Sequence, residues 1–196
     1  MSRKALVERK TKETQIRLSL NLDGTGASQI ESPVPFLNHM MQQVAVHGGM
    51  DLELKAQGDV EVDAHHTVED VAICLGEAVK QALGDKKGIV RYGAFSVPLD
   101  EALSRVTVDF GGRPYVVFQA ECLKPGRIGD FDVELVRDFF QGFANHALAN
   151  VHVHAEYGEN RHHIVESMFK AFARAVRSAV RREEGASAVP STKGTL

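Results

Sequence analysis

Two copies of one histidine-rich motif carry the clearest chemical signal in this sequence. Residues 65–70 read HHTVED and residues 162–167 read HHIVES, so both stretches contain HHxxE. If both stretches are helical, each glutamate shares a face with its histidines, because residues three and four apart are neighbours on a helix. The two adjacent histidines of a motif lie about 100° apart around the helix axis and point to different places. We therefore expect each helix to offer one histidine to one metal ion and a histidine–glutamate pair to another.

Each metal site needs further ligands, and the helix that precedes each motif is the place to look for them. His39 precedes the first motif and Asp138 lies at the corresponding place before the second. Imidazole and carboxylate donors without thiolate favour manganese, iron or zinc, and ligand type alone leaves all three open. A histidine at a helix start can also be a cap or a surface residue, but two copies in a repeat favour metal. The candidate ligands are His39, His65, His66, Glu69, Asp138, His162, His163 and Glu166.

Composition and charge limit the class of protein. The chain has 196 residues, 43% of them hydrophobic and 25% charged, as expected for a globular protein of one domain or two fused halves. A net charge of −3 argues against a general nucleic-acid binder. No apolar run approaches the roughly 20 residues that cross a bilayer, and the N-terminus lacks a secretory pattern. Two cysteines without a CxxC pair fit a reducing compartment. We expect a cytoplasmic protein with no nucleic-acid or membrane partner.

The elements that would hold the motifs follow from hydrophobic periodicity and from the turn residues between them. Alternating polar and apolar residues predict strands, and apolar residues three and four apart predict helices. In the first half, the predicted strands are 13–22, 27–32 and 50–58, and the predicted helices are 35–49 and 65–84. In the second half, the predicted strands are 101–112, 113–123 and 150–158, and the predicted helices are 132–148 and 160–182.

The two halves repeat one order of elements, strand-strand-helix-strand-helix. The similarity extends to sequence, because LSLNLDG aligns with VTVDFGG and HHTVED with HHIVES. We predict an α+β fold with two-layer α/β halves, in which two helices cover one face of each sheet. The polar, glycine-rich stretch GDKKGIVRYG at 84–93 is predicted to connect the halves. The predicted units are residues 1–90, residues 91–185 and an extended tail at 186–196.

Several segments together resemble one known family. DAHHTVEDVAICLGEA, GENRHHIVESMFKAFARA, FLNHM, LDEAL, GGRPY and STKG are similar to the imidazoleglycerol-phosphate dehydratase family, and the similarity runs from about Arg9 to the C-terminus. The resemblance implies an internally duplicated fold of the ribosomal protein S5 domain 2-like type. It also implies a carbon–oxygen lyase that converts D-erythro-imidazole-glycerol phosphate to imidazole-acetol phosphate in histidine biosynthesis. Two Mn²⁺ ions per active site and a homo-oligomer of 24 subunits, with active sites between subunits, are further implications.

The resemblance also implies roles for individual residues. All the candidate metal ligands except Asp138 match the family pattern, and several relatives have histidine at that position. Glu13 matches a glutamate placed beside the substrate, so it is the first acid–base candidate; Glu101 in the second half, Glu69 and Glu166 are alternatives. No GxxxxGK[ST] phosphate loop is present, so basic and hydroxyl side chains must bind the phosphate. The implied substrate-binding residues are Glu13, His65, Arg91, Arg113, His162, Lys170, Ser191, Thr192 and Lys193.

The implied reaction makes chemical sense with two metals. The proton to be removed is weakly acidic because no carbonyl group lies beside it. Two ions bound to the two ring nitrogens would turn the ring into an imidazolate, whose electrons expel the hydroxyl group. A non-catalytic histidine-rich metal-binding protein is one alternative. Another is a dinuclear metal hydrolase, which requires two ions about 3.5–4 Å apart.

Overall fold

The chain folds as two successive copies of one arrangement of strands and helices, seen in a computed structural model that describes residues 3–196. The first half contains β1 (Lys4–Lys10), β2 (Thr14–Asn21), β3 (Ser28–Glu31), α1 (Pro35–Gly48), β4 (Asp51–Gly58) and α2 (His65–Leu83). The second half contains β5 (Tyr92–Leu99), β6 (Ala102–Asp109), β7 (Tyr115–Gln119), β8 (Arg127–Ile128), β9 (Phe131–Asp132), α3 (Leu135–Ala147), β10 (Asn150–Tyr157) and α4 (Arg161–Val180).

The duplication is confirmed, but the repeating unit has one more strand than the sequence predicted. The sheets have the orders β1-β2-β4-β3 and β5-β6-β10-β7, so equivalent strands occupy equivalent places. The prediction missed β1 and β5, the first strand of each half. In β1 only Val7 is buried, so charged residues hide the alternation. In β5, Gly93 and Pro98 suggest a loop, yet an edge strand tolerates proline. The predicted connector at 84–93 therefore ends where β5 begins, at Tyr92.

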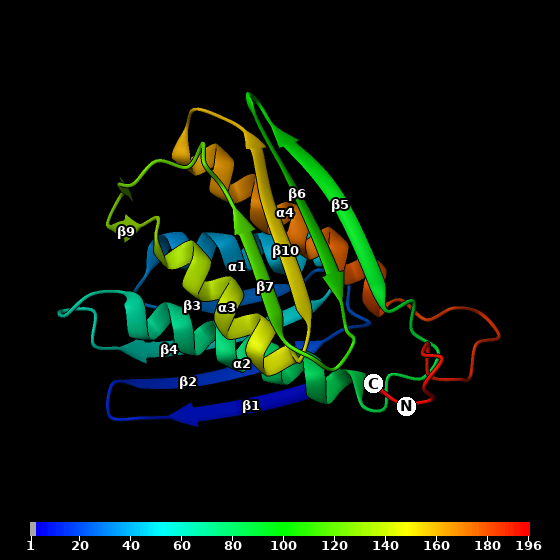
Figure 1. Ribbon diagram of the computed structural model, residues 1–196. Coiled ribbons are helices and arrows are strands. Elements are labelled where there is room, and N and C mark those ends of the chain that lie inside the picture. The colour runs from blue at the N-terminus through cyan, green and yellow to red at the C-terminus, as the bar shows by residue number, and fades with distance from the viewer. Residues whose placement is uncertain (1–2) are drawn as a thin grey trace.

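Helices α1 to α4 lie between the two sheets. Helices α1 and α2 cover the sheet of the first half, and α3 and α4 cover the sheet of the second (Figure 1). Alternate residues of β2 and β10 are buried against the helices, because successive side chains of a strand point to opposite faces. The predicted fold, with two helices on one face of each sheet, is confirmed. Between the helical layers, α2 packs against α3 and α1 packs against α4, so each contact joins the two halves.

Close helix packing fixes the separation of α2 and α3. A Cβ atom added at Gly76 on α2 would lie 2.6 Å from the carbonyl oxygen of Phe143 on α3. A larger residue at 76 would therefore force the helices apart. Because α2 carries the first HHxxE motif and α3 carries Asp138, this contact sets how closely the predicted ligands approach. The start of the helix that carries the second motif is fixed by its N-cap. The side chain of Asn160 accepts a hydrogen bond from the backbone N–H of His162.

The two four-stranded sheets share no strand within residues 3–196. This supports the boundary that we propose between residues 90 and 91. The proposed tail segment, 186–196, begins beside the connector, where the backbone N–H of Gly88 donates to the carbonyl of Ala188 at 3.0 Å. Among the helices of the described chain, none combines the length and the apolar character needed to cross a membrane.

Candidate active site

Three predicted ligands meet between α1 and α4, in what we call the α1/α4 cluster: His39, His162 and Glu166. Glu166 Oε2 lies 3.1 Å from His39 Nε2 and 2.9 Å from His162 Nε2. One ligand atom from each residue lies within 4.8 Å of the others, and Glu166 is buried while the histidines are half-buried. Two imidazole nitrogens and one carboxylate oxygen form a donor set that suits a divalent manganese, iron or zinc ion.

Lys170 completes the surroundings of Glu166. Its Nζ atom lies 2.7 Å from Glu166 Oε1, one helical turn further along α4. Burial opposes the charge of Glu166, but the interactions with Lys170, His39 and His162 outweigh it and hold the pKa of Glu166 at about 2. Glu166 is therefore a carboxylate at neutral pH, the form that binds a cation.

The equivalent residues on the other two helices form the α2/α3 cluster: His65, Glu69 and Asp138. His65 Nδ1 lies 3.5 Å from Asp138 Oδ2, and His65 Nε2 lies 3.9 Å from Glu69 Oε2. Asp138 on α3 takes the place that His39 takes on α1, against the second helix of the opposite half. The structure thus brings Asp138 to the first motif, although it precedes the second motif in sequence.

The second histidine of each motif points away from its cluster. The rings of His65 and His66 are inclined at 87°, and those of His162 and His163 at 82°. His66 Nδ1 lies 3.1 Å from Asp59 Oδ2 and 3.9 Å from Glu13 Oε2. Each helix therefore presents two separate donor directions, as its spacing predicts.

The two acid–base candidates at the starts of equivalent strands differ in their contacts. Glu101 Oε1 accepts hydrogen bonds from the backbone N–H groups of Glu159 and Asn160 at 3.1 and 2.7 Å. Its other oxygen lies 2.7 Å from His163 Nδ1. These hydrogen bonds, led by that of His163, lower the pKa of Glu101 to about 2. Glu101 is thus held at the N-terminus of α4.

Glu13 has much weaker contacts. Its side chain is 53% exposed, and the only charged partner of its carboxylate within the described chain is His66, at 3.9 Å. Its backbone N–H donates to Thr11 Oγ1 at 3.0 Å, so the turn is fixed while the carboxylate extends into solvent. Of the two glutamates, Glu13 has the more exposed side chain, at 53% against 36% for Glu101.

Most of the predicted phosphate-binding residues line one cavity of about 690 Å³. Arg113 and Lys193 supply positive charge there. Arg91 also lines the cavity, but it donates through Nε to Asp109 Oδ1 at 2.7 Å and through a terminal nitrogen to the carbonyl of Pro190 at 2.8 Å. Arg91 therefore attaches the C-terminal tail to the sheet. The predicted residues in the cavity are Arg91, Arg113, Ser191, Thr192 and Lys193; Lys170 lies apart, beside Glu166.

The cavity and the α1/α4 cluster lie near opposite ends of α4. Figure 1 shows the start of β5 beside the C-terminal end of that helix. The backbone N–H of Arg91 donates to the carbonyl of Ala179, near the helix C-terminus, whereas Glu166 is near its start. The rise along an α-helix places Glu166 and Ala179 about 20 Å apart. One small molecule cannot reach both places in a single chain.

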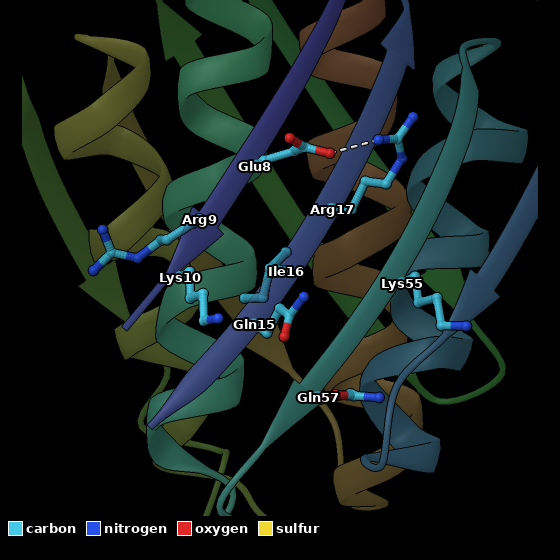
Figure 2. A pocket seen from close by; sticks show the side chains of 8 residues that line it. All are labelled: Glu8, Arg9, Lys10, Gln15, Ile16, Arg17, Lys55 and Gln57. Carbon is cyan, nitrogen blue, oxygen red and sulfur yellow. Dashed lines mark hydrogen bonds and ion pairs between the residues drawn. The ribbon is translucent and has the colours of Figure 1, made fainter. Parts of the chain in front are cut away.

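A second cavity, of about 350 Å³, lies on the outer face of the first sheet and contains no predicted site residue. Figure 2 shows its side chains across β1, β2 and β4, with Glu8 paired to Arg17 at 2.5 Å and Arg9 directed elsewhere. Arg9 instead pairs with the buried Asp70 at 2.8 Å. This outer face is a set of exposed, largely paired charges rather than a site.

Sequence reasoning missed two acidic residues beside the second histidines. Asp59 contacts His66, and Asp100 Oδ2 lies 3.9 Å from His163 Nε2. Asp100 adopts a positive φ of 46°, which few residues other than glycine adopt. The available signal was its place beside Glu101, in the turn between two strands of one hairpin. Paired histidine–carboxylate clusters on a duplicated α+β fold, with a basic cavity, indicate an enzyme for an anionic small molecule.

Comparisons with known proteins identify the family. A family model described as imidazoleglycerol-phosphate dehydratase matches residues 32–176. Proteins of that name from Geobacter sulfurreducens and Geobacter metallireducens are 57% and 56% identical, over 100% of both chains. A solved dehydratase structure from Staphylococcus aureus has 38% identity and a TM-score of 0.83, and covers 92% of this chain and 99% of its own. One from Pyrococcus furiosus, in complex with (S)-C348, has 35% identity, a TM-score of 0.84, and coverages of 97% and 100%.

The class and the family follow directly. The protein is a hydro-lyase, a carbon–oxygen lyase that removes water from its substrate. It belongs to the imidazoleglycerol-phosphate dehydratase family, and its function is the dehydration of imidazoleglycerol phosphate in histidine biosynthesis. The resemblance of the histidine motifs to this family is confirmed.

Proposed function

We propose that this dehydration takes place between two Mn²⁺ ions, at active sites that are completed by neighbouring copies of the chain. The observation that carries the proposal is the pair of clusters, each formed by the first helix of one half and the second helix of the other. His39, His162 and Glu166 would hold one ion, and His65, Glu69 and Asp138 the other. His66 and His163 point out of both clusters, so we assign them to ions held by a neighbouring copy.

Once held by these residues, the ions would supply positive charge that stabilises the negative charge developing on the substrate ring. Each cluster offers both imidazole and carboxylate donors, and Glu166 is ionised, so the donors suit this task. The clusters lie on different helix pairs, α1/α4 and α2/α3. That arrangement favours two separate ions over the bridged pair of a dinuclear hydrolase, in which the ions lie about 3.5–4 Å apart.

Glu13 is the residue that we propose moves protons. Its carboxylate is exposed beside His66, so it can accept a proton from a substrate carbon and donate one to the departing hydroxyl group. Glu101 is engaged by two backbone N–H groups and His163, which makes it the weaker candidate. Glu166 contacts His39, His162 and Lys170, and Glu69 is the equivalent residue of the α2/α3 cluster, so we assign both to ion binding rather than to proton transfer.

The basic cavity is the proposed phosphate site. Arg113 and Lys193 supply charge, Ser191 and Thr192 supply hydroxyl groups, and Arg91 orders the tail that carries three of these residues. Because the cavity lies about 20 Å from the α1/α4 cluster along α4, phosphate and ring must be bound by different copies in that site. This requirement supports a homo-oligomer. The 24-subunit shell that the resemblance implies is the assembly we propose.

The phosphate assignment is tested by Arg113→Ala. We expect the KM for imidazoleglycerol phosphate to rise about 10- to 100-fold, because one charge-assisted contact to a phosphate group is lost. Bound metal should stay unchanged, because the cavity lies at the far end of α4 from Glu166. Gly112, beside Arg113, contacts Leu148 at the end of α3, whereas Asp138 lies near the start of that helix. Steady-state kinetics and elemental analysis of the purified protein measure the two quantities.

The matched control is Arg105→Ala, which removes an exposed arginine that pairs with Glu156 at 3.1 Å on another part of the same sheet. Its KM should stay within about twofold of the wild-type value, as for most surface changes. An unchanged KM in Arg113→Ala would contradict the phosphate site. The histidine clusters would then still be candidates for metal binding, but the cavity would have no assigned ligand.

A further inference from the structure

Lys86 is a buried lysine in the connector between the halves. Only 7% of the residue is exposed, and its Nζ donates to the carbonyl of Phe110 at 3.0 Å. Its backbone has a positive φ of 59°, an unfavourable conformation for a residue with a side chain. Strained residues of this kind persist where the surrounding structure holds them, and they concentrate at functional sites. Burying an ammonium group is also costly, so the position requires a reason.

The contacts of Lys86 lead to the wall of the basic cavity. Phe110, whose carbonyl it binds, is followed by Gly111, Gly112 and Arg113, which all line that cavity. The backbone N–H of Phe110 in turn donates to the carbonyl of Arg91 at 3.2 Å. Lys86 thus supports, from behind, the strand end that carries one phosphate-binding arginine and contacts the other.

The charge of Lys86 provides a second link to the phosphate site. Arg91 donates to both carboxylate oxygens of Asp109, at 2.7 and 3.1 Å, so its charge is largely balanced. Burial lowers the pKa of Lys86, Asp109 counteracts this, and Arg91 adds to the lowering, which shows that the three charges interact. A buried charge is screened less by solvent and salt than an exposed one. Lys86 therefore restores positive potential to a cavity in which Arg91 alone would contribute little.

We propose that Lys86 is a positioning residue for the substrate phosphate: its ammonium group fixes the Phe110 carbonyl and adds buried positive charge behind the Arg91–Arg113 wall. This inference rests on the proposed phosphate site and extends it to a residue that does not touch the ligand. The chemistry recognised is that of a phosphate monoester or inorganic phosphate.

The test uses the assembled, metal-loaded enzyme with inorganic phosphate as a competitive inhibitor. Lys86→Met removes the charge and keeps the chain length. We expect the Ki of phosphate and the KM of the substrate to rise about tenfold, the effect of one charge acting at moderate effective dielectric, while kcat stays within about twofold. Lys87→Met is the matched control, because that neighbouring lysine is exposed and pairs with the exposed Asp85 at 2.9 Å. Its Ki should equal that of the wild-type enzyme.

Two further variants separate the outcomes. Lys86→Gln keeps a polar group, and it replaces Lys86→Met in the comparison if the latter fails to fold. A lower melting temperature with an unchanged Ki would assign Lys86 to the fold alone and overturn the proposal. Arg113→Ala, measured in the same way, separates the two hypotheses. If it raises the Ki and the Lys86 variants do not, only the Lys86 inference fails; if none of them raises it, the phosphate site itself is wrong.

Discussion

Replacing Glu13 by glutamine should lower kcat about 10²- to 10⁴-fold, the usual contribution of a positioned proton-transfer group. Glutamine keeps the size and the hydrogen-bonding capacity of the side chain but cannot exchange a proton. Within residues 3–196, the carboxylate of Glu13 has no closer charged contact than His66 at 3.9 Å, so the fold of this part does not depend on it. Metal content and melting temperature should stay at the wild-type values, and KM should change little. Steady-state kinetics with elemental analysis and thermal unfolding provide these measurements.

Glu101→Gln is the matched control, because Glu101 occupies the equivalent place in the second half. Its carboxylate accepts hydrogen bonds from the backbone N–H groups of Glu159 and Asn160, the two residues that precede α4. Loss of that charge should lower the melting temperature, because these backbone N–H groups lose a charged acceptor, with a smaller loss of kcat than in Glu13→Gln. The roles of the two glutamates would be reversed if Glu101→Gln lost more kcat than Glu13→Gln at unchanged stability.

Glu166→Gln is expected to remove the ion of the α1/α4 cluster and abolish measurable turnover. The neutral amide weakens the attraction for a cation and leaves the neighbouring Lys170 ammonium without its carboxylate partner, 2.7 Å away in the native protein. We expect more than a 100-fold loss of metal affinity at that site, since changes to residues that merely orient ligands already cost about 10- to 100-fold. Equilibrium dialysis against Mn²⁺ followed by elemental analysis measures the stoichiometry.

Glu8→Gln is the control for this substitution, because Glu8 is exposed and pairs with Arg17 on the outer face of the first sheet. Its metal content should match that of the wild-type protein. Glu166→Gln with full metal content and full affinity would refute the cluster as an ion site.

Glu166→Gln also serves to test whether active sites are shared between copies. Mixed assemblies of Glu166→Gln and Arg113→Ala should regain part of the wild-type activity, because some sites then combine an intact cluster from one copy with an intact cavity from another. At low substrate concentration Glu166→Gln alone should be inactive, and Arg113→Ala alone should keep only about 1 to 10% of the wild-type activity. Mixed assemblies without recovered activity would place phosphate and ring within one chain, contrary to the separation along α4.

Much of the fold could be predicted from sequence, since buried strands and amphipathic helices impose their own periodicity. The two motif helices, α2 and α4, began at or next to the predicted residues. The first strand of each half was missed because β1 buries a single side chain and β5 contains a glycine and a proline. Both are edge strands, in which few neighbours constrain the sequence.

The site was predictable only where its residues lie close together in sequence. The HHxxE spacing identified each histidine–glutamate pair, but it could not show that α1 meets α4 and that α2 meets α3. That exchange depends on long-range packing, including the approach of α2 to α3 at Gly76. The different contacts of Glu13 and Glu101 were equally hidden, because those of Glu101 involve backbone N–H groups nearly sixty positions away in sequence. Lys86 gave no signal at all, since the burial of this lysine in the glycine-rich connector is a property of the fold.

The most direct test of the account is a crystal structure of the Mn²⁺-loaded enzyme with a non-reacting imidazole analogue of the substrate. We predict that the two ring nitrogens each face a different ion, one held by the α1/α4 cluster of one copy and the other by the α2/α3 cluster of another. The phosphate group should lie against Arg113 and Lys193, and the carboxylate of Glu13 should lie beside the substrate carbon chain. A ring whose nitrogens face no ion, or two ions bridged by one carboxylate, would contradict the account.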